Sequence, residues 1–438
     1  MRILWLSINS GLFQQDNFAT PYNGGGWISS LQQVFTNCEE HQLALAFLCP
    51  FHLEKEEQNH TLYYPIFSAP KTALAKIKEY YGGYKKLDKQ QYVKDILRVI
   101  EDFQPDIIHL FGIENPLATI LGNTSIPIVV HVQGLLAPID NAFFPNDFNK
   151  SSFLFPFSMN EWLLRNGYVY AKNNMHVRGL RERELFKKVD YVMGRTAWDY
   201  QVSQLLAPKS QYFHVNEVLR ESFYKNAGKW EWANQEFTII STISNTVYKG
   251  LDVILKTAQL LKRETNISFK WQIVGIKEQD KIIRFFERKL KIDSRHVNIE
   301  YRGVLSEQEL CDTLLTCHLY VHPSYIDNSP NSICEAQMLG VPVIGTFVGG
   351  IPSLIKHEET GLLVPANAPY ELTYQINKCH DNKEFCIRLG QNGCKVAQTR
   401  HNKKDILNSL ISTYRMIINL NKEACSPVTF PANSIQNI

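Results

Sequence analysis

The chain has 438 residues, a formal net charge of +3 at pH 7 and 44% hydrophobic residues. This length is enough for two α/β domains with a core each, and the charge is too small to indicate a nucleic-acid partner. No apolar run has the length of a membrane span, and residues 1–10 lack the layout of a signal peptide, so we expect a cytoplasmic protein.

The cysteines form no CxxC motif and no Cys/His spacing of the kind found at metal sites. Cys38, Cys49, Cys311 and Cys317 lie in apolar or helical contexts, which is typical of reduced, buried thiols. We therefore predict reduced cysteines and no bound metal.

Strands and helices alternate through the first half of the chain. Residues 2–8 are a continuous apolar run, which predicts a central parallel strand. Further strands are predicted over 42–48, 105–110, 126–132 and 191–194, with a charged helix over 178–190. The alternation predicts a doubly wound sheet that binds ligands at the carboxyl ends of its strands. His109 and His131 fall within these strands, where a core histidine is a better interpretation than a catalytic base.

A second domain of the same kind begins near Phe237. Residues 225–235 are polar and carry glycine and lysine, as a linker does, and strands are predicted over 237–243 and 269–274. Apolar residues recur at helical spacing from Ile406 to Ile418, which predicts a long amphipathic helix. We therefore divide the chain into a first domain (1–224), a linker (225–235), a second domain (236–400), a C-terminal helix (401–420) and a tail (421–438).

Residues 319–352 are the most informative stretch of the sequence. Residues 319–321 predict a short buried strand, and after a polar loop Ser329 is suited to cap a helix whose first residue is Pro330. Asn331, Ser332 and Ile333 then present free backbone amides at the positive end of that helix. Such amides bind anions, so the stretch predicts a site for the phosphates of a nucleotide.

Two carboxylates flank this predicted phosphate site. Asp327 lies in the loop before the helix, and Glu335 lies about a turn and a half inside it. Acids beside a phosphate site are consistent with a ligand that also carries hydroxyls, and a nucleotide-sugar carries both groups. Glu335 would accept hydrogen bonds from the ribose and Asp327 from the sugar. The alternative interpretation is a capped βαβ unit with two solvated acids.

This combination resembles the donor-binding signature of the retaining family 4 glycosyltransferases, which belong to the glycosyl transferases group 1. Their pattern is an acid, seven residues and Glu-Ala, followed by Gly-x-Pro-Val and Gly-Gly-x-Pro. Here the pattern is found as Asp327, Glu335-Ala336, Gly340-Val341-Pro342-Val343 and Gly349-Gly350-Ile351-Pro352. The resemblance is continuous from about residue 237 to 365 and patchier before it. It implies the α/β GT-B fold, in which two Rossmann-like domains face each other across a cleft, and a nucleotide-sugar donor used without a cofactor or metal.

The resemblance also assigns the candidate site. It places Asp327 and Glu335 in the reaction, and it places the donor against Lys249, Gly275 and the run Asn328, Ser329, Pro330, Asn331 and Ser332. Many family members carry a histidine where this chain has Gln133, which cannot exchange a proton but can hydrogen-bond a sugar hydroxyl. Members usually carry an arginine where this chain has Ser244, so we expect Arg220 or Arg302 to replace the missing positive charge.

The first domain supplies the remaining candidates. Gly25 and Gly26 belong to a glycine-rich turn that lets a ligand approach the backbone, although a simple tight turn explains them equally well. Glu114 is the candidate acceptor-side carboxylate. Arg195 and Arg220 lie in runs similar to a branch of the family associated with bacterial surface polysaccharides. They would line the cleft, and ordinary ion pairs are the alternative.

Residues Lys71–Lys94 form a basic stretch with tyrosines between the lysines. Such a segment can lie on an anionic membrane surface, and a solvated helix face is the alternative. Peripheral contact with the inner face of a membrane is therefore one of two interpretations of this stretch, and both stay open.

The sequence therefore predicts a retaining glycosyltransferase of surface polysaccharide synthesis. It would move a sugar from a nucleotide-sugar donor to a saccharide or lipid-linked acceptor. Two alternatives stay open: a nucleotide-sugar-binding GT-B protein without transferase activity, and a GT-B nucleotide-sugar epimerase.

Overall fold

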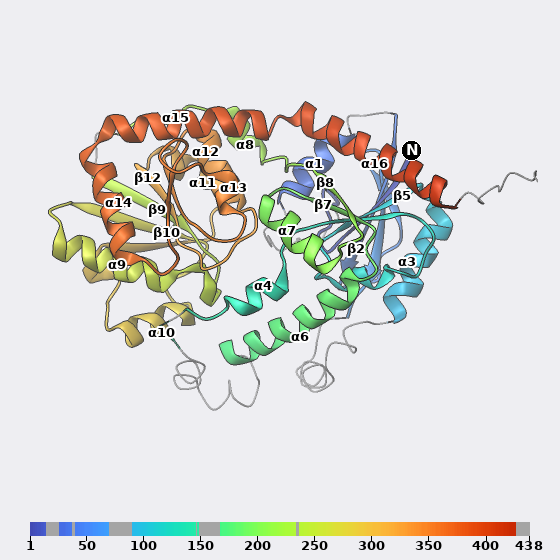
Figure 1. Ribbon diagram of the computed structural model, residues 1–438, viewed down its shortest axis with the longest axis horizontal. Coiled ribbons are helices and arrows are strands. Elements are labelled where there is room, and N and C mark those ends of the chain that lie inside the picture. Colours follow the sequence, from blue (N-terminus) through green and yellow to red (C-terminus); the bar gives the residue numbers. More distant parts are fainter. Residues whose placement is uncertain are drawn as a thin grey trace, which may run out of the picture.

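The computed structural model describes residues 1–14, 26–36, 40–69, 90–145, 147–148, 167–233 and 236–425. Gly25, most of the Lys71–Lys94 stretch and the end of the predicted tail lie outside these residues. The molecule has two lobes, each built on one sheet (Figure 1).

The first domain contains an eight-stranded sheet with the strand order β3-β4-β2-β1-β5-β6-β7-β8. All pairs are parallel except β3 with β4. The strands are β1 (Arg2–Ser7), β2 (Gln42–Cys49), β3 (Glu56–Gln58), β4 (Thr61–Phe67), β5 (Ile107–Phe111), β6 (Ile128–His131), β7 (Tyr191–Gly194) and β8 (Gln211–His214). The helices are α1 (Gly26–Thr36), α3 (Gln90–Phe103), α4 (Leu136–Asn141), α6 (Tyr168–Phe186), α7 (Ala197–Leu206) and the short 3-10 helix η2 (Pro116–Ile120).

The apolar runs of the sequence explain the middle of this sheet. Every residue of β5, β6 and β7 is buried, as expected of parallel strands covered on both faces. The sequence pattern did not predict strands β3, β4 and β8, because their apolar runs are short or interrupted by polar residues. The charged helix predicted over 178–190 is α6, which ends four residues earlier, at Phe186.

The second domain contains a six-stranded, fully parallel sheet with the order β11-β10-β9-β12-β13-β14. The strands are β9 (Phe237–Thr242), β10 (Phe269–Val274), β11 (Ile299–Gly303), β12 (Leu319–His322), β13 (Val343–Thr346) and β14 (Leu362–Val364). The helices are α8 (Glu221–Lys225), α9 (Leu251–Glu264), α10 (Lys281–Leu290), α11 (Glu307–Leu315), α12 (Asn331–Leu339), α13 (Ile351–Leu354), α14 (Pro369–Asp381) and α15 (Lys383–Arg400), with the 3-10 turns η4 (Val247–Lys249) and η5 (Arg295–Val297).

Helix α16 (Lys403–Cys425) crosses from the second domain back to the first, and α15 and α16 run along the top of both lobes (Figure 1). Its residues Ile406, Leu410, Tyr414 and Ile417 are buried in the core of the first domain. The apolar residues that recur at helical spacing from Ile406 to Ile418 therefore form the face of α16 that packs against the first domain.

The described part of the predicted linker packs on the second domain. Trp230 is buried there, and the amides of Gly228 and Trp230 donate to carbonyl groups at the end of α12. Leu219 and Phe223 belong to the same core. The chain therefore enters the second domain before the predicted linker begins.

A hydrogen-bonded chain of buried side chains ties α16 to the first sheet. Trp5 Nε1 donates to Tyr414 Oη over 3.1 Å, and Tyr414 Oη lies 2.5 Å from His109 Nδ1. His109 Nε2 lies 3.1 Å from His131 Nδ1. Burial lowers the pKa of His109 to about 3, so both rings are neutral core histidines, as predicted.

Changing Tyr414 to Phe is expected to destabilise the protein by about 1–3 kcal/mol, because the buried Trp5 and His109 nitrogens both lose their partner. Urea unfolding measures this change. Tyr374→Phe, at a tyrosine that is 65% exposed, is the matched control. Equal stability of both variants would contradict the assigned role of the hydroxyl.

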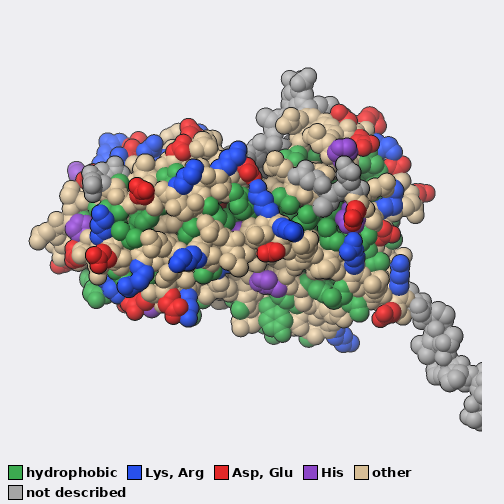
Figure 2. Space-filling model, turned by 90° about the horizontal axis from the view of Figure 1, so that it is seen from above, with side chains coloured by type: hydrophobic (Ala, Val, Ile, Leu, Met, Phe, Trp, Pro, Cys, Tyr) green, Lys and Arg blue, Asp and Glu red, His purple; other side chains and the backbone are tan. Residues whose placement is uncertain are grey.

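The described helices include none that is both long enough and apolar enough to span a membrane. On the face seen in Figure 2, basic and acidic side chains are intermixed over the described residues of both lobes.

Candidate functional site

A cavity of about 630 Å³ opens between the two domains, which is a size suited to a nucleotide-sized ligand. It lies at the carboxyl ends of the parallel strands, as the doubly wound topology requires. Gln133 follows β6, Arg195 follows β7, and Gly275 follows β10. The other predicted site residues in its wall are Gly26, Arg220, Lys249, Asp327, Ser329, Pro330, Asn331, Ser332 and Glu335.

The helix at the centre of the predicted phosphate site begins one residue later than expected. Pro330, not Ser329, is the N-cap, and α12 starts at Asn331. The reason is that the backbone of Pro330 is extended, with a ψ of 113°. The amide of Ile333 donates to the Pro330 carbonyl over 3.0 Å, so it is not free as predicted. Within the described residues the amides of Asn331 and Ser332 have no acceptor, so these two stay available to an anion.

Lys249 and Asp327 form an ion pair in the cavity wall. Lys249 Nζ lies 2.5 Å from Asp327 Oδ2, and His322 Nε2 lies 2.9 Å from the same oxygen. Burial by itself would raise the pKa of Asp327, but Lys249 and His322 outweigh burial and hold the pKa well below its ordinary value. Burial lowers the pKa of His322 despite its acidic neighbour, so the ring is neutral at pH 7. The site thus holds a carboxylate, an ammonium group and a neutral imidazole.

Glu335 and Arg220 form a second pair with two parallel hydrogen bonds. Arg220 Nε donates to Oε1 over 2.7 Å, and Nη2 donates to Oε2 over 2.8 Å. Burial raises the pKa of Glu335, and Arg220 offsets part of that effect. Both side chains are more than nine-tenths buried, so the pair forms a fixed, charged corner of the cavity.

The first domain closes the cavity with three polar or aromatic side chains. Trp27 Nε1 donates to Gln133 Oε1 over 3.1 Å, which orients the amide that stands in place of the usual histidine. The Arg195 guanidinium lies over the Trp27 ring, with 5.1 Å between its central carbon and the ring centroid. Arg195 Nη1 is 3.5 Å from Glu217 Oε2. Arg195 therefore lines the cavity and also forms an ion pair, so the two interpretations that the sequence left open both apply to it.

Asn328 and Ser329 hold the two domains together beside the cavity. Thr196 Oγ1 donates to Asn328 Oδ1 over 3.2 Å, and Asn328 Nδ2 approaches the Gln133 carbonyl at 3.4 Å. Ser329 Oγ donates to Glu217 Oε1 over 3.2 Å. Asn328 does not line the cavity, so the structure places it in an interdomain contact.

Glu114 lies outside the cavity, which corrects its predicted position beside the acceptor. The cause is local: Gly112 has a φ of +86°, and the Glu114 carboxylate folds back over it. Burial raises the pKa of Glu114 to about 7. The predicted substitute Arg302 is exposed and also lies outside the cavity wall, whereas Ser244 lines it.

Glu182 on α6 is a second buried acid near Glu114. Its carboxylate accepts from the amides of Leu136 and Ala137, and burial raises its pKa from 4.5 to about 7. Because the pKa of Glu182 is higher in the folded than in the unfolded protein, ionisation of this carboxyl destabilises the folded state. The free energy of unfolding therefore decreases as the pH rises above 4.5, and the decrease is complete above pH 7.

Relative to the unchanged protein, the stability of Glu182→Gln should therefore rise by up to about 3 kcal/mol as the pH increases from 4.5 to 8. A pH-independent loss adds to this trend, because Gln has one acceptor oxygen for the two backbone amides. Urea unfolding at several pH values measures the difference. Glu184→Gln, at an exposed glutamate of the same helix, is the control and should show no such trend. A pH-independent difference for Glu182→Gln would contradict the raised pKa.

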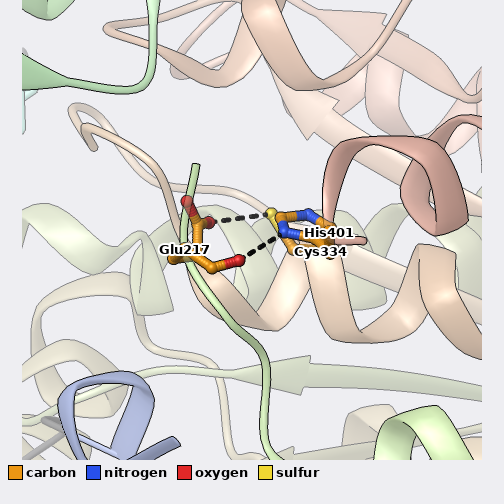
Figure 3. A group of neighbouring side chains, drawn as sticks. All are labelled: Glu217, Cys334 and His401. Atoms are coloured by element: carbon orange, nitrogen blue, oxygen red, sulfur yellow. Dashed lines mark hydrogen bonds between the residues drawn. The ribbon is translucent and has the colours of Figure 1, made fainter. Parts of the chain in front are cut away.

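Three buried side chains with metal-binding chemistry meet behind the cavity: Glu217, Cys334 and His401 (Figure 3). Their candidate ligand atoms lie within 4.8 Å of one another. His401 Nδ1 donates to the Glu217 carbonyl, however, and the Cys334 thiol contacts the Glu217 carboxylate. Burial raises the pKa of Cys334 well above its ordinary value, so the thiol keeps its proton. We interpret the group as a hydrogen-bonded contact between the segment before α8 and the segment between α15 and α16, where the chain passes from one domain to the other. The absence of a metal stays a prediction.

Sequence reasoning missed Trp27 and His322 as cavity residues. His322 ends β12, and polar residues at the carboxyl ends of parallel strands are the signal that would have found it. Trp27 belongs to the buried face of α1, and only its hydrogen bond to Gln133 reveals its second role.

Two Rossmann-like domains that face each other across such a cavity define the GT-B fold, so the fold prediction is confirmed. Over 96% of this chain and 99% of the other, the structure is similar to that of sucrose-phosphate synthase from Thermosynechococcus elongatus, with a TM-score of 0.68 and 14% sequence identity. It is also similar to Anabaena HepE in complex with UDP-glucose, over 95% of this chain and 100% of that chain, with a TM-score of 0.60 and 15% identity.

Residues 223–396 match the family described as Glycosyl transferases group 1, so this chain carries a domain of that family. A curated relative is the putative colanic acid biosynthesis glycosyltransferase WcaL of Escherichia coli (strain K12). It is 28% identical over 144 residues, which cover 32% of this chain and 34% of the relative. The chain therefore spans about a third of the length of this relative.

Proposed function

We propose that this protein is a retaining glycosyltransferase that uses a nucleotide-sugar donor. The observation that supports this most is the arrangement around the start of α12. The amides of Asn331 and Ser332 and the Lys249 ammonium group are suited to the phosphates, whereas Asp327 and Glu335 are suited to hydroxyl groups. A nucleotide-sugar carries both kinds of group in one molecule.

In the proposed reaction the bond between the anomeric carbon and the diphosphate oxygen breaks. The acceptor oxygen forms the new glycosidic bond on the same face of the sugar, and its proton passes to the departing phosphate oxygen. Lys249 and the two amides stabilise the negative charge that grows on the diphosphate. Gln133 orients a sugar hydroxyl, because its amide cannot act as a base. These protein groups supply the positive charge, so we propose that the reaction needs no metal.

The acceptor is proposed to be a saccharide or a lipid-linked saccharide of a surface polysaccharide. The similarity to the putative colanic acid biosynthesis glycosyltransferase of E. coli supports this class. We also propose that the protein acts in the cytoplasm and contacts the inner face of the membrane through Lys71–Lys94, a stretch that lies largely outside the described residues.

The test begins with a screen of UDP-, GDP-, ADP- and dTDP-sugars for thermal stabilisation, because a bound donor raises the unfolding temperature by mass action. The donor that binds is then incubated with oligosaccharide and lipid-linked acceptors, and the anomeric configuration of the product is determined by NMR. Retention of the donor's configuration is expected. An inverted product would contradict the retaining mechanism.

The same experiment separates the two alternatives. A donor that binds but is neither transferred nor hydrolysed would indicate a binding protein, a reading that Gln133 and Ser244 favour because both depart from the usual family residues. Recovery of an epimeric nucleotide-sugar would indicate an epimerase.

A further inference from the structure

Arg195 occupies a fixed position at the interface between the two domains. It follows β7 directly, and its amide donates to Asp199 Oδ2 over 2.9 Å. Thr196 and Asp199 form a capping box at the start of α7, so the backbone of this turn is held on both sides. The side chain lines the cavity and is only 3% exposed.

The guanidinium group of Arg195 has unused donors. Nε and Nη1 are buried and have no hydrogen-bond partner among the described residues. Glu217 neutralises the charge from 3.5 Å without completing a hydrogen bond. A buried charged group without hydrogen bonds costs free energy, and a ligand that supplies acceptors recovers it.

The other cations of the cavity wall differ from Arg195 in this respect. Lys249 donates to Asp327, and Arg220 donates to Glu335 through two nitrogens. The sequence suggested that Arg220 or Arg302 replaces the arginine that is missing at Ser244. Arg220 donates its hydrogen bonds to Glu335, and Arg302 lies outside the cavity wall. Neither is therefore positioned to replace the arginine that is missing at position 244.

The surroundings of Arg195 indicate which anion it meets. The next residue, Thr196, donates to Asn328, and Glu217 accepts from Ser329. Asn328 and Ser329 belong to the loop that leads into α12, whose first two amides have no acceptor in the part of the chain that the structure describes. Arg195 therefore stands beside the proposed phosphate site, although it comes from the opposite domain.

We propose that Arg195 binds the diphosphate of the donor from the first domain and takes the place of the missing arginine at position 244. This inference rests on the proposed function, since it assumes a nucleoside diphosphate donor. Its consequence is that both domains hold the leaving group: Lys249 and the α12 amides from one side, Arg195 from the other. Binding of the diphosphate then draws the domains together, and the closed cleft excludes water.

The test measures binding of UDP, GDP, ADP, the corresponding nucleosides and inorganic pyrophosphate by calorimetry. Arg195→Gln is expected to weaken the diphosphate that binds best, and pyrophosphate, by about 10- to 100-fold. Binding of the matching nucleoside should change less than twofold. Arg302→Gln is the matched control, because that arginine is exposed and lies outside the cavity wall.

Removing Arg195 leaves Glu217 without its cation, so thermal unfolding is followed in parallel. The double variant Arg195→Gln/Glu217→Gln removes both charges and should show the same selective loss of diphosphate binding in a folded protein. Equal affinity of the unchanged protein and a folded variant for the diphosphate overturns the inference and points to an anionic group on the acceptor. Absence of binding of any nucleoside diphosphate to the unchanged protein overturns the proposed function as well.

Discussion

Changing Lys249 to Met is expected to reduce sugar transfer by about 100- to 1,000-fold. Lys249 is the ammonium group in the cavity wall that faces the proposed leaving diphosphate, and its loss removes a charge that counts most when the bond to the sugar breaks. The substitution also leaves Asp327 with only the neutral His322 as a partner, so the pKa of Asp327 rises. Steady-state kinetics with the identified donor measure the effect, and the fall should appear mainly in kcat.

The matched control for this experiment is Lys378→Met. Lys378 forms an ion pair of 2.6 Å with Glu358 in the same domain, but it does not line the cavity. The control should keep full activity, because breaking a surface pair costs little. If Lys249→Met transferred sugar as fast as this control, the diphosphate site would have to lie elsewhere.

Changing Glu335 to Gln is expected to abolish donor binding and to destabilise the protein at the same time. The carboxylate accepts two hydrogen bonds from a buried arginine, and removal of one partner of such a pair costs about 3–5 kcal/mol. Loss of activity in this variant alone would therefore not distinguish a missing ligand contact from a disturbed fold.

The double variant Glu335→Gln/Arg220→Gln separates these two causes. It removes both charges, so most of the stability should return. The negatively charged acceptor for the ribose hydroxyls stays absent, so the donor should still bind at least about tenfold more weakly. Thermal unfolding and calorimetric titration of the donor give the two readouts. Full donor affinity in the double variant would contradict the role assigned to Glu335.

The order of elements and the centre of the candidate site could be read from the sequence because both depend on local patterns. Strands β1 and β9 are buried except for one end residue each, and β10 is buried except for Lys270. The acid, helix start and glycine turns of residues 319–352 keep a fixed spacing. Cap residues and helical periodicity act within a few positions of one another. That is why Lys249, Asp327 and Glu335 were found together in one cavity as expected.

The partners of these residues depended on the tertiary structure. Arg220 and Glu335 are 115 positions apart, and no local spacing indicates that their side chains meet. Arg195 reaches the cavity because β7 ends at the domain interface, whereas Glu114 is turned away by the conformation of Gly112. The sequence by itself determined which groups of this protein have the charge and polarity that suit phosphates and hydroxyls. Only the packing of two sheets against a shared cavity decided which charges are paired, because burial and ion pairing arise between segments that are distant along the chain.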